Sequence, residues 1–189
     1  MAIRWPWSES AGETEHVVSK VIYSVAVSLD GFIALPDGSF DWLMPYPPDA
    51  DFADRFLSGI GGILMGRACL DLELAMNGAV YPDRRVAVMT HRPVDNLPAN
   101  ARCFAGDLAE PLAWLREREG DVWLYGGGQL AGQALAAGVI DEIHTAVVPV
   151  SLGAGIALFG GAPSVPRSWA FDSVTRSASG YVMLTYRKV

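Results

Sequence analysis

Three short segments place glycines or cations directly after apolar runs, and residues of these types can bind phosphate. Backbone N–H groups at a helix N-terminus stabilise phosphate oxygens, and arginine grips phosphate through forked hydrogen bonds. If the three segments meet in space, they suit the phosphates of a dinucleotide. The segments are Gly66, Arg67 and Ala68; Thr90, His91 and Arg92; and Gly126, Gly127, Gly128 and Gln129, followed by Leu130.

The glycine triplet has two physical explanations. Glycine is kept where φ must be positive or where another group approaches closely. That group could be a phosphate at the N-terminus of the following helix, or the helix itself packing tightly onto the sheet. The segment does not match the G-x-G-x-x-G fingerprint, which disfavours an ordinary Rossmann dehydrogenase. Arg67, His91 and Arg92 can equally be solvated surface residues.

Apolar runs alternate with amphipathic segments along most of the chain, which predicts alternating strands and helices. This pattern predicts a three-layer α/β fold, with a mostly parallel central sheet, helices on both faces and a C-terminal antiparallel hairpin. We expect a weakly structured leader over 1–19 and a single domain over 20–189. The expected strands are 21–29, 62–66, 86–89, 101–106, 122–125 and 139–150, with the hairpin at 169–189; the expected helices are 51–60, 68 onward, 108–120 and the segment after Gly128.

The composition limits the partners of the chain. Its 189 residues and 51% hydrophobic content suffice for one well-buried domain. A net charge of −7 disfavours nucleic acid, and no apolar run reaches the roughly 18 residues of a membrane span. Cys69 and Cys103 lack metal-ligand spacing, so we expect reduced thiols, no metal and a cytoplasmic protein.

Five motifs occur in an order that resembles the dihydrofolate reductase-like superfamily. They are SLDGFIA, ILMGR, VMTHRP, VWLYGGGQLAGQAL and IDEIHTAVVPVSLGAGIALF. The branch they most resemble is the reductase domain of the bifunctional riboflavin-biosynthesis deaminase–reductase, and the resemblance covers Val21 to Val189. It implies the same fold, NADPH as cofactor and hydride transfer to a C=N or C=O bond. It also implies a small-molecule substrate and a homodimer.

The resemblance also implies roles for individual residues. The Gly66–Ala68 turn would approach the adenosine phosphates, Thr90–Arg92 the 2′-phosphate, and Gly126–Leu130 the pyrophosphate. Ala26 and Ile33 would bracket the loop at the nicotinamide. The residues on the substrate side would be Ser28, Asp30, Asp41 and Trp42.

Asp30 is the candidate catalytic residue, because its carboxyl group, or a water that it orients, could supply the proton that makes an imine electrophilic. The other explanation is that Asp30 caps the turn that Asp30-Gly31 begins, by accepting hydrogen bonds from backbone N–H groups. Both roles can coexist.

Two other functions stay open. A true dihydrofolate reductase would carry a carboxylate on its first helix, where Asp51 and Asp54 lie without an assignable match. A non-catalytic nucleotide-binding or dimerisation module could fill the substrate cavity with the bulky segment FDWLMPYPP. The stretch from Ala68 to Arg85 also lacks the acidic, proline- and arginine-containing pattern with which riboflavin-pathway reductases bind the ribose phosphate.

Overall fold

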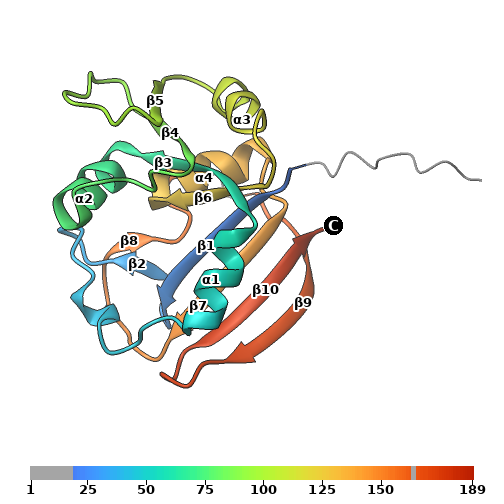
Figure 1. The fold of residues 1–189 in the computed structure, drawn as a ribbon. Coiled ribbons are helices and arrows are strands. Elements are labelled where there is room, and N and C mark those ends of the chain that lie inside the picture. Colours follow the sequence, from blue (N-terminus) through green and yellow to red (C-terminus); the bar gives the residue numbers. More distant parts are fainter. Residues whose placement is uncertain (1–18, 163–164) are drawn as a thin grey trace, which may run out of the picture.

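The computed structural model describes residues 19–162 and 165–189, and the predicted leader lies outside them except for Ser19. A central sheet of eight strands dominates these residues (Figure 1). Its strands are β1 (Val21–Ser28), β3 (Ile60–Gly66), β4 (Arg85–Met89), β5 (Ala101–Phe104), β6 (Asp121–Gly126), β7 (Glu142–Val148), β9 (Trp169–Arg176) and β10 (Val182–Lys188).

The strand order is β5-β4-β3-β6-β1-β7-β10-β9. All strands from β5 to β7 in this order are parallel to one another. The C-terminal hairpin adds β10 antiparallel to β7 and β9 antiparallel to β10. The predicted fold class, including the hairpin, is therefore confirmed.

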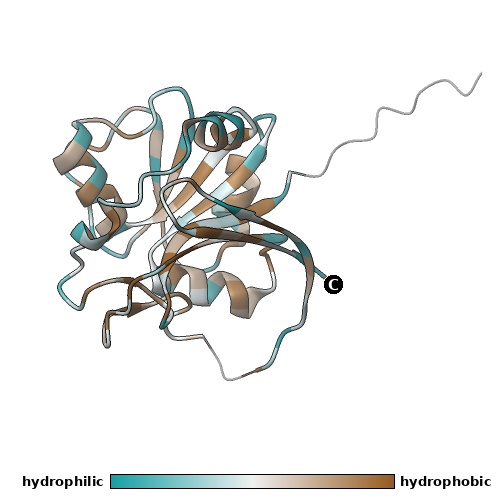
Figure 2. Cartoon of the chain, turned by 90° about the horizontal axis from the view of Figure 1, so that it is seen from below, coloured by the Kyte–Doolittle hydropathy of each residue, from teal (hydrophilic) through white to brown (hydrophobic). Residues whose placement is uncertain are grey.

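Helices cover both faces of the sheet, since each central strand buries side chains in both directions. In β1, Val21 and Tyr23 enter one apolar cluster and Ile22 enters another, as the two-residue period of a strand requires. The helices α3 (Ala109–Leu115) and α4 (Gly128–Ala137) pack on the first cluster, and α1 (Ala50–Ser58) and α2 (Arg67–Asn77) cover the other face. Figure 2 shows the hydrophobic residues concentrated along the central strands.

Some elements differ from the prediction. The strand expected over 139–150 is the shorter β7, and Asp141, directly before it, accepts a hydrogen bond from the Val21 N–H with its side chain at 2.9 Å. This strand lies between β1 and β10, and β9 stands at one edge of the sheet. The short elements β2 (Phe32–Ala34), β8 (Ile156–Ala157) and η1 (Asp41–Leu43) were not predicted.

Two glycines let α4 lie directly against the segment around β8. A Cβ added at Gly128 would stand 2.1 Å from the carbonyl oxygen of Ala157. A Cβ added at Gly132 would stand 2.1 Å from the carbonyl oxygen of Gly160. Side-chain carbons do not approach backbone oxygens so closely, so only glycine fits at either position. Close packing is thus the explanation for the third glycine of the triplet.

Replacing Gly132 with alanine tests this contact through the sign of its effect. Helix propensity alone predicts that Gly132→Ala stabilises the protein by about 0.5–1 kcal/mol. The clash with Gly160 predicts a loss of about 1–3 kcal/mol instead. Urea unfolding should show the loss, while Gln133→Ala, at the exposed neighbouring position, should stay within about 0.5 kcal/mol of the parent. A more stable Gly132→Ala variant would contradict the packing.

Candidate functional site

Two strand-to-helix turns lie side by side at the carboxyl edge of the sheet. β3 leads into α2 and β6 leads into α4, and Met65 of β3 pairs with Gly126 of β6. Gly66 caps α2 and Gly127 caps α4, so no side chain caps either helix, and neither first turn carries an acidic residue. The free N–H groups and the positive dipole ends of two helices therefore converge on one place.

The backbone at these turns is open to an approaching group. A Cβ added at Gly126, where φ is 120° and the following peptide bond is cis, would meet no atom within 4 Å. A Cβ added at Gly127 would meet only the Cys69 sulfur, at 3.9 Å. Burial raises the pKa of the Cys69 thiol to about 11, so this sulfur is not a thiolate at neutral pH. Close packing therefore does not explain Gly126 or Gly127, and the positive φ of Gly126 itself favours glycine.

Arginine and threonine fix the neighbouring turn after β4. The Arg67 side chain pairs with Asp71 (Nε to Oδ1, 2.7 Å) and donates from Nη1 to the Pro93 carbonyl oxygen at 2.8 Å. Thr90 Oγ1 accepts a hydrogen bond from the Arg92 N–H at 3.1 Å. His91 is exposed, and Arg92 makes no ion pair with any other described residue. Since β4 is next to β3, all three predicted phosphate segments lie along one edge.

Asp30 ties together two loops at the same edge. Its carboxylate accepts hydrogen bonds from the Ser28 hydroxyl at 2.6 Å and from the Gly153 N–H at 2.7 Å, and Leu152 N–H contributes at 3.1 Å. Ser28 Oγ also accepts from the Phe32 N–H at 2.9 Å. The loop after β1 is therefore joined to the loop after β7.

These bonds lower the pKa of Asp30 to about 2, mainly through the Ser28 hydroxyl and then through the Leu152 and Gly153 N–H groups. At neutral pH the carboxyl group is ionised, so it is poorly suited to donate a proton. Ser28 is 2% exposed and both of its hydrogen bonds stay within the loop, so its hydroxyl is not presented to a substrate. The geometry gives both residues a positioning role, in line with the turn-capping explanation for Asp30, and their predicted roles on the substrate side stay predictions.

The remaining predicted residues lie on the side of the sheet that α1 covers or beside β2. Ala26 and Trp42 both pack against the apolar cluster of Val148, Tyr181 and Met183, and the Trp42 Nε1–H is buried without a hydrogen-bond acceptor. Ile33 is half-buried in β2, and Asp41 is exposed at the start of η1. Ala26 and Trp42 are therefore placed near each other by one cluster, and Asp41 stands apart from it.

A group of half-buried rings lies between α1 and α2, and the sequence did not predict that these rings meet. Trp123 lies at the centre: its ring centroid is 4.8 Å from Tyr125, 5.3 Å from Phe56 and 5.7 Å from Tyr81. Its Nε1–H donates to the Ser24 carbonyl oxygen at 3.0 Å. The two-residue period of a strand predicts that Trp123 and Tyr125 of β6 lie on one face of the sheet. The contacts that Tyr81 and Phe56 make with them depend on the tertiary fold.

A buried carboxylate lies behind these rings. Glu73 of α2 accepts hydrogen bonds from the Tyr125 hydroxyl and from Asn77 Nδ2, the latter at 2.8 Å. Burial, together with this carboxylate, raises the pKa of Tyr125, and burial raises that of Tyr81 to about 12. Both phenols are therefore neutral at physiological pH, and the Tyr125 hydroxyl donates its proton to the hydrogen bond with Glu73.

This fold defines a dihydrofolate reductase-like protein. A protein from Shewanella sp. PV-4 that is named for riboflavin biosynthesis has a similar structure, with a TM-score of 0.76 and 25% identity, covering 90% of this chain and 99% of that one. A dihydrofolate reductase from Enterococcus faecalis, solved with NADP(H), has a TM-score of 0.63 at 18% identity, covering 89% and 95% of the two chains. At that identity, the second likeness shows the fold alone.

Residues 19–183 match the model of the RibD C-terminal domain, and the chain belongs to this family. It is 30% identical over 175 residues to the riboflavin biosynthesis protein RibD of Mycobacterium tuberculosis, covering 82% of this chain but only 51% of that protein. It is also 31% identical over 150 residues to the uncharacterized protein YwjB of Bacillus subtilis, covering 74% of this chain and 82% of YwjB. The predicted resemblance is confirmed.

Two other features concern the described residues only. None of their helices has the length and apolar character needed to cross a membrane. No group of three or more histidine, cysteine, aspartate or glutamate side chains is placed to hold a metal ion within residues 19–162 and 165–189.

The contacts of Asp30 predict how acid affects stability. Because folding lowers its pKa from 3.8 to about 2, the carboxylate contributes stability above pH 4 or so, and this contribution is lost as the pH falls toward about 2. Urea unfolding should show that Asp30→Asn is less stable than the parent near neutral pH, with the difference shrinking through this window. The exposed Asp54→Asn is the control and should show no such trend. A constant difference for Asp30→Asn down to about pH 2 would contradict the hydrogen bonds that Asp30 accepts from Ser28, Leu152 and Gly153.

Proposed function

We propose that this protein is an NADPH-dependent reductase that transfers a hydride to a C=N or C=O bond of a small heterocyclic substrate, as in 5-amino-6-(5-phosphoribosylamino)uracil reductases. The observation that carries the proposal is the pair of uncapped helix N-termini on the neighbouring strands β3 and β6. Membership in the RibD C-terminal domain family supports a reductase.

The residues at the edge fit a dinucleotide phosphate. Methyl groups at Gly126 and Gly127 would project into the open face, so a bound group can approach the backbone there. The N–H groups of Gly128, Gln129 and Leu130 begin α4 and can donate to the pyrophosphate. On α2, the N–H of Ala68 can serve a second phosphate oxygen. Phosphate oxygens would thus accept the hydrogen bonds that a side-chain cap accepts at other helices.

Preference for NADPH over NADH rests on the turn after β4. Arg67 keeps guanidinium N–H groups beyond those that bond Asp71 and Pro93, since arginine has five donors in all. Arg92, at the exposed end of the same turn, has no carboxylate partner among the described residues, and His91 lies beside it. A 2′-phosphate at this place would neutralise the two arginines.

NADPH supplies the hydride when bound, and the protein positions the reacting groups. The hydrogen bond from the Gly153 N–H to Asp30 holds the loop between Ala26 and Ile33, where the nicotinamide would lie. Because Asp30 is ionised at neutral pH, we assign the proton for the acceptor nitrogen to water. On the substrate side, Trp42 and Asp41 remain proposed contacts of the substrate. The half-buried rings of Trp123 and Tyr125 are further proposed contacts.

The alternative of a true dihydrofolate reductase has weaker support. The acidic residues of α1, Asp51 and Asp54, are exposed, and the residues that α1 turns toward the sheet are Phe52 and Phe56. No carboxylate of this helix therefore faces the position where a pterin ring would need one. The non-catalytic alternative predicts either no NADPH binding or binding without turnover.

Alanine substitutions of the two arginines test the cofactor assignment. Arg92→Ala should weaken NADPH binding by about tenfold or more, since it removes charge-assisted hydrogen bonds, and the double variant with Arg67→Ala should lose more. NADH binding should change by less than about threefold. Titration calorimetry with both cofactors measures this, with Arg102→Ala, at an exposed ion pair on β5, as the control. Equal losses for NADPH and NADH would refute the 2′-phosphate site.

We also propose that the chain forms a homodimer through the uncovered face of its terminal hairpin. A β-bulge in β9 places Phe171 and Val174 opposite Tyr186 and Leu184, two residues apart on β10, so all four side chains share one face. Phe171 is 59% and Val174 57% exposed. An apolar face of this kind at a sheet edge is a hazard for a lone chain and a typical contact for a second copy.

Charges on this face should prevent the association. We expect sedimentation equilibrium to show a dimer for the parent chain and a monomer for the Phe171→Asp, Val174→Asp double variant, because two buried carboxylates would lack partners. Ser173→Asp is the matched control, since Ser173 pairs with Thr185 and lies on the other face of β9. A monomeric parent chain, or a control that dissociates as fully as the double variant, would refute the interface.

A further inference from the structure

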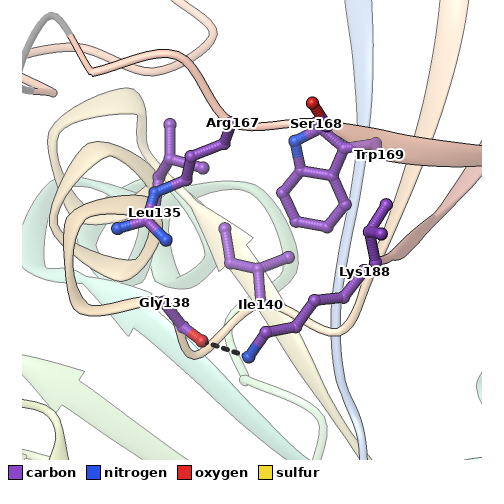
Figure 3. A pocket seen from close by; sticks show the side chains of 8 residues that line it. Leu135, Gly138, Ile140, Arg167, Ser168, Trp169 and Lys188 are labelled. Carbon is purple, nitrogen blue, oxygen red and sulfur yellow. Dashed lines mark hydrogen bonds between the residues drawn. The ribbon is translucent and has the colours of Figure 1, made fainter.

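A cavity of about 260 Å³ lies at the opposite edge of the sheet from the proposed cofactor site (Figure 3). It forms where α4 ends at Ala137, beside the residues that precede β9 and the residue that ends β10. Leu135 and Ile140 supply apolar surface, and the Trp169 indole forms a flat wall. The volume suits a ligand with a body about the size of one ring.

Two cations reach the cavity from opposite sides. Arg167 Nη2 donates to the Ala136 carbonyl oxygen at 2.9 Å, and Lys188 Nζ donates to the Gly138 carbonyl oxygen at 2.6 Å. No carboxylate of residues 19–162 and 165–189 forms an ion pair with either side chain. Two cations without an ion-pair partner among the described residues therefore line one largely apolar cavity.

The C-terminus of α4 neutralises only part of the positive charge of Arg167 and Lys188. The C-terminus of a helix carries roughly half a negative charge, whereas Arg167 and Lys188 together carry two positive ones. Each cation spends one N–H group on its carbonyl oxygen, and arginine has five such groups while the lysine ammonium has three. Both therefore retain donors and charge for an anion at the mouth of the cavity.

We infer that this cavity binds a small carboxylate with a flat apolar body. The carboxylate would lie between Arg167 and Lys188, where the arginine fork suits its two oxygens, and the apolar body would lie against Trp169, Leu135 and Ile140. The cavity and the glycine turn of α4 stand at opposite ends of that helix, so the ligand is not the molecule that the proposed reaction reduces.

Phenylacetate and its uncharged analogue phenylacetamide test the site, because they share one shape and differ in charge. Titration calorimetry should show millimolar or tighter binding of phenylacetate, and at least about tenfold weaker binding of phenylacetamide. Arg167→Met and Lys188→Met keep the apolar stems and should each weaken phenylacetate by about tenfold. The control Arg102→Met, which changes the net charge equally at a distant surface, should bind phenylacetate like the parent.

Three results would overturn the inference. They are equal affinity of the parent chain for the acid and the amide, no phenylacetate binding at millimolar concentration, and an equal loss in the Arg102→Met control. The comparison of the acid with the amide uses the parent chain alone, so it decides the question even if a variant fails to fold. NADPH binding should be unchanged in both methionine variants, which separates this site from the proposed cofactor site.

Discussion

The backbone contact between α4 and the segment around β8 fixes most of what surrounds the candidate site. Gly128 and Gly132 bring the helix against the carbonyl oxygens of Ala157 and Gly160, which holds the first turn of α4 at the end of β6. The adjacent β3 brings the first turn of α2 to the same place through the pairing of Met65 with Gly126. The two dipole ends therefore lie side by side because packing and strand register place them there.

The three glycines of the triplet have different surroundings. Any side chain at Gly128 would meet the Ala157 carbonyl oxygen, whereas a Cβ added at Gly126 would meet no atom within 4 Å and one added at Gly127 only the Cys69 sulfur, at 3.9 Å. The φ of 120° at Gly126 also favours glycine. The same helix has a second charged feature at its other end, where Arg167 and Lys188 reach its carbonyl oxygens. One short helix thus presents bare N–H groups at the carboxyl edge of the sheet and excess cations at the amino edge.

Local patterns in the sequence predicted the sheet and the edge along which the three predicted phosphate-binding segments lie. Parallel strands end on the same side, so Arg67, Thr90 and Gly126 had to lie along one edge once the strands were recognised. Partners that come from distant segments could not be predicted. The nearby Ser28 hydroxyl contributes most to the lowered pKa of Asp30, but its other partners, the N–H groups of Leu152 and Gly153, come more than a hundred residues later in the chain.

The proposed cofactor site depends most on the backbone N–H groups at the start of α2 and α4. The most direct test is a titration of the ¹⁵N-labelled protein with NADPH, followed through the amide resonances of assigned residues. We predict that the largest shifts occur at Ala68, Gly128, Gln129 and Leu130, with Arg92 shifting for NADPH and not for NADH. Binding of NADPH that leaves the amides of Gly128 to Leu130 unmoved, or an absence of binding, would contradict the proposed cofactor site.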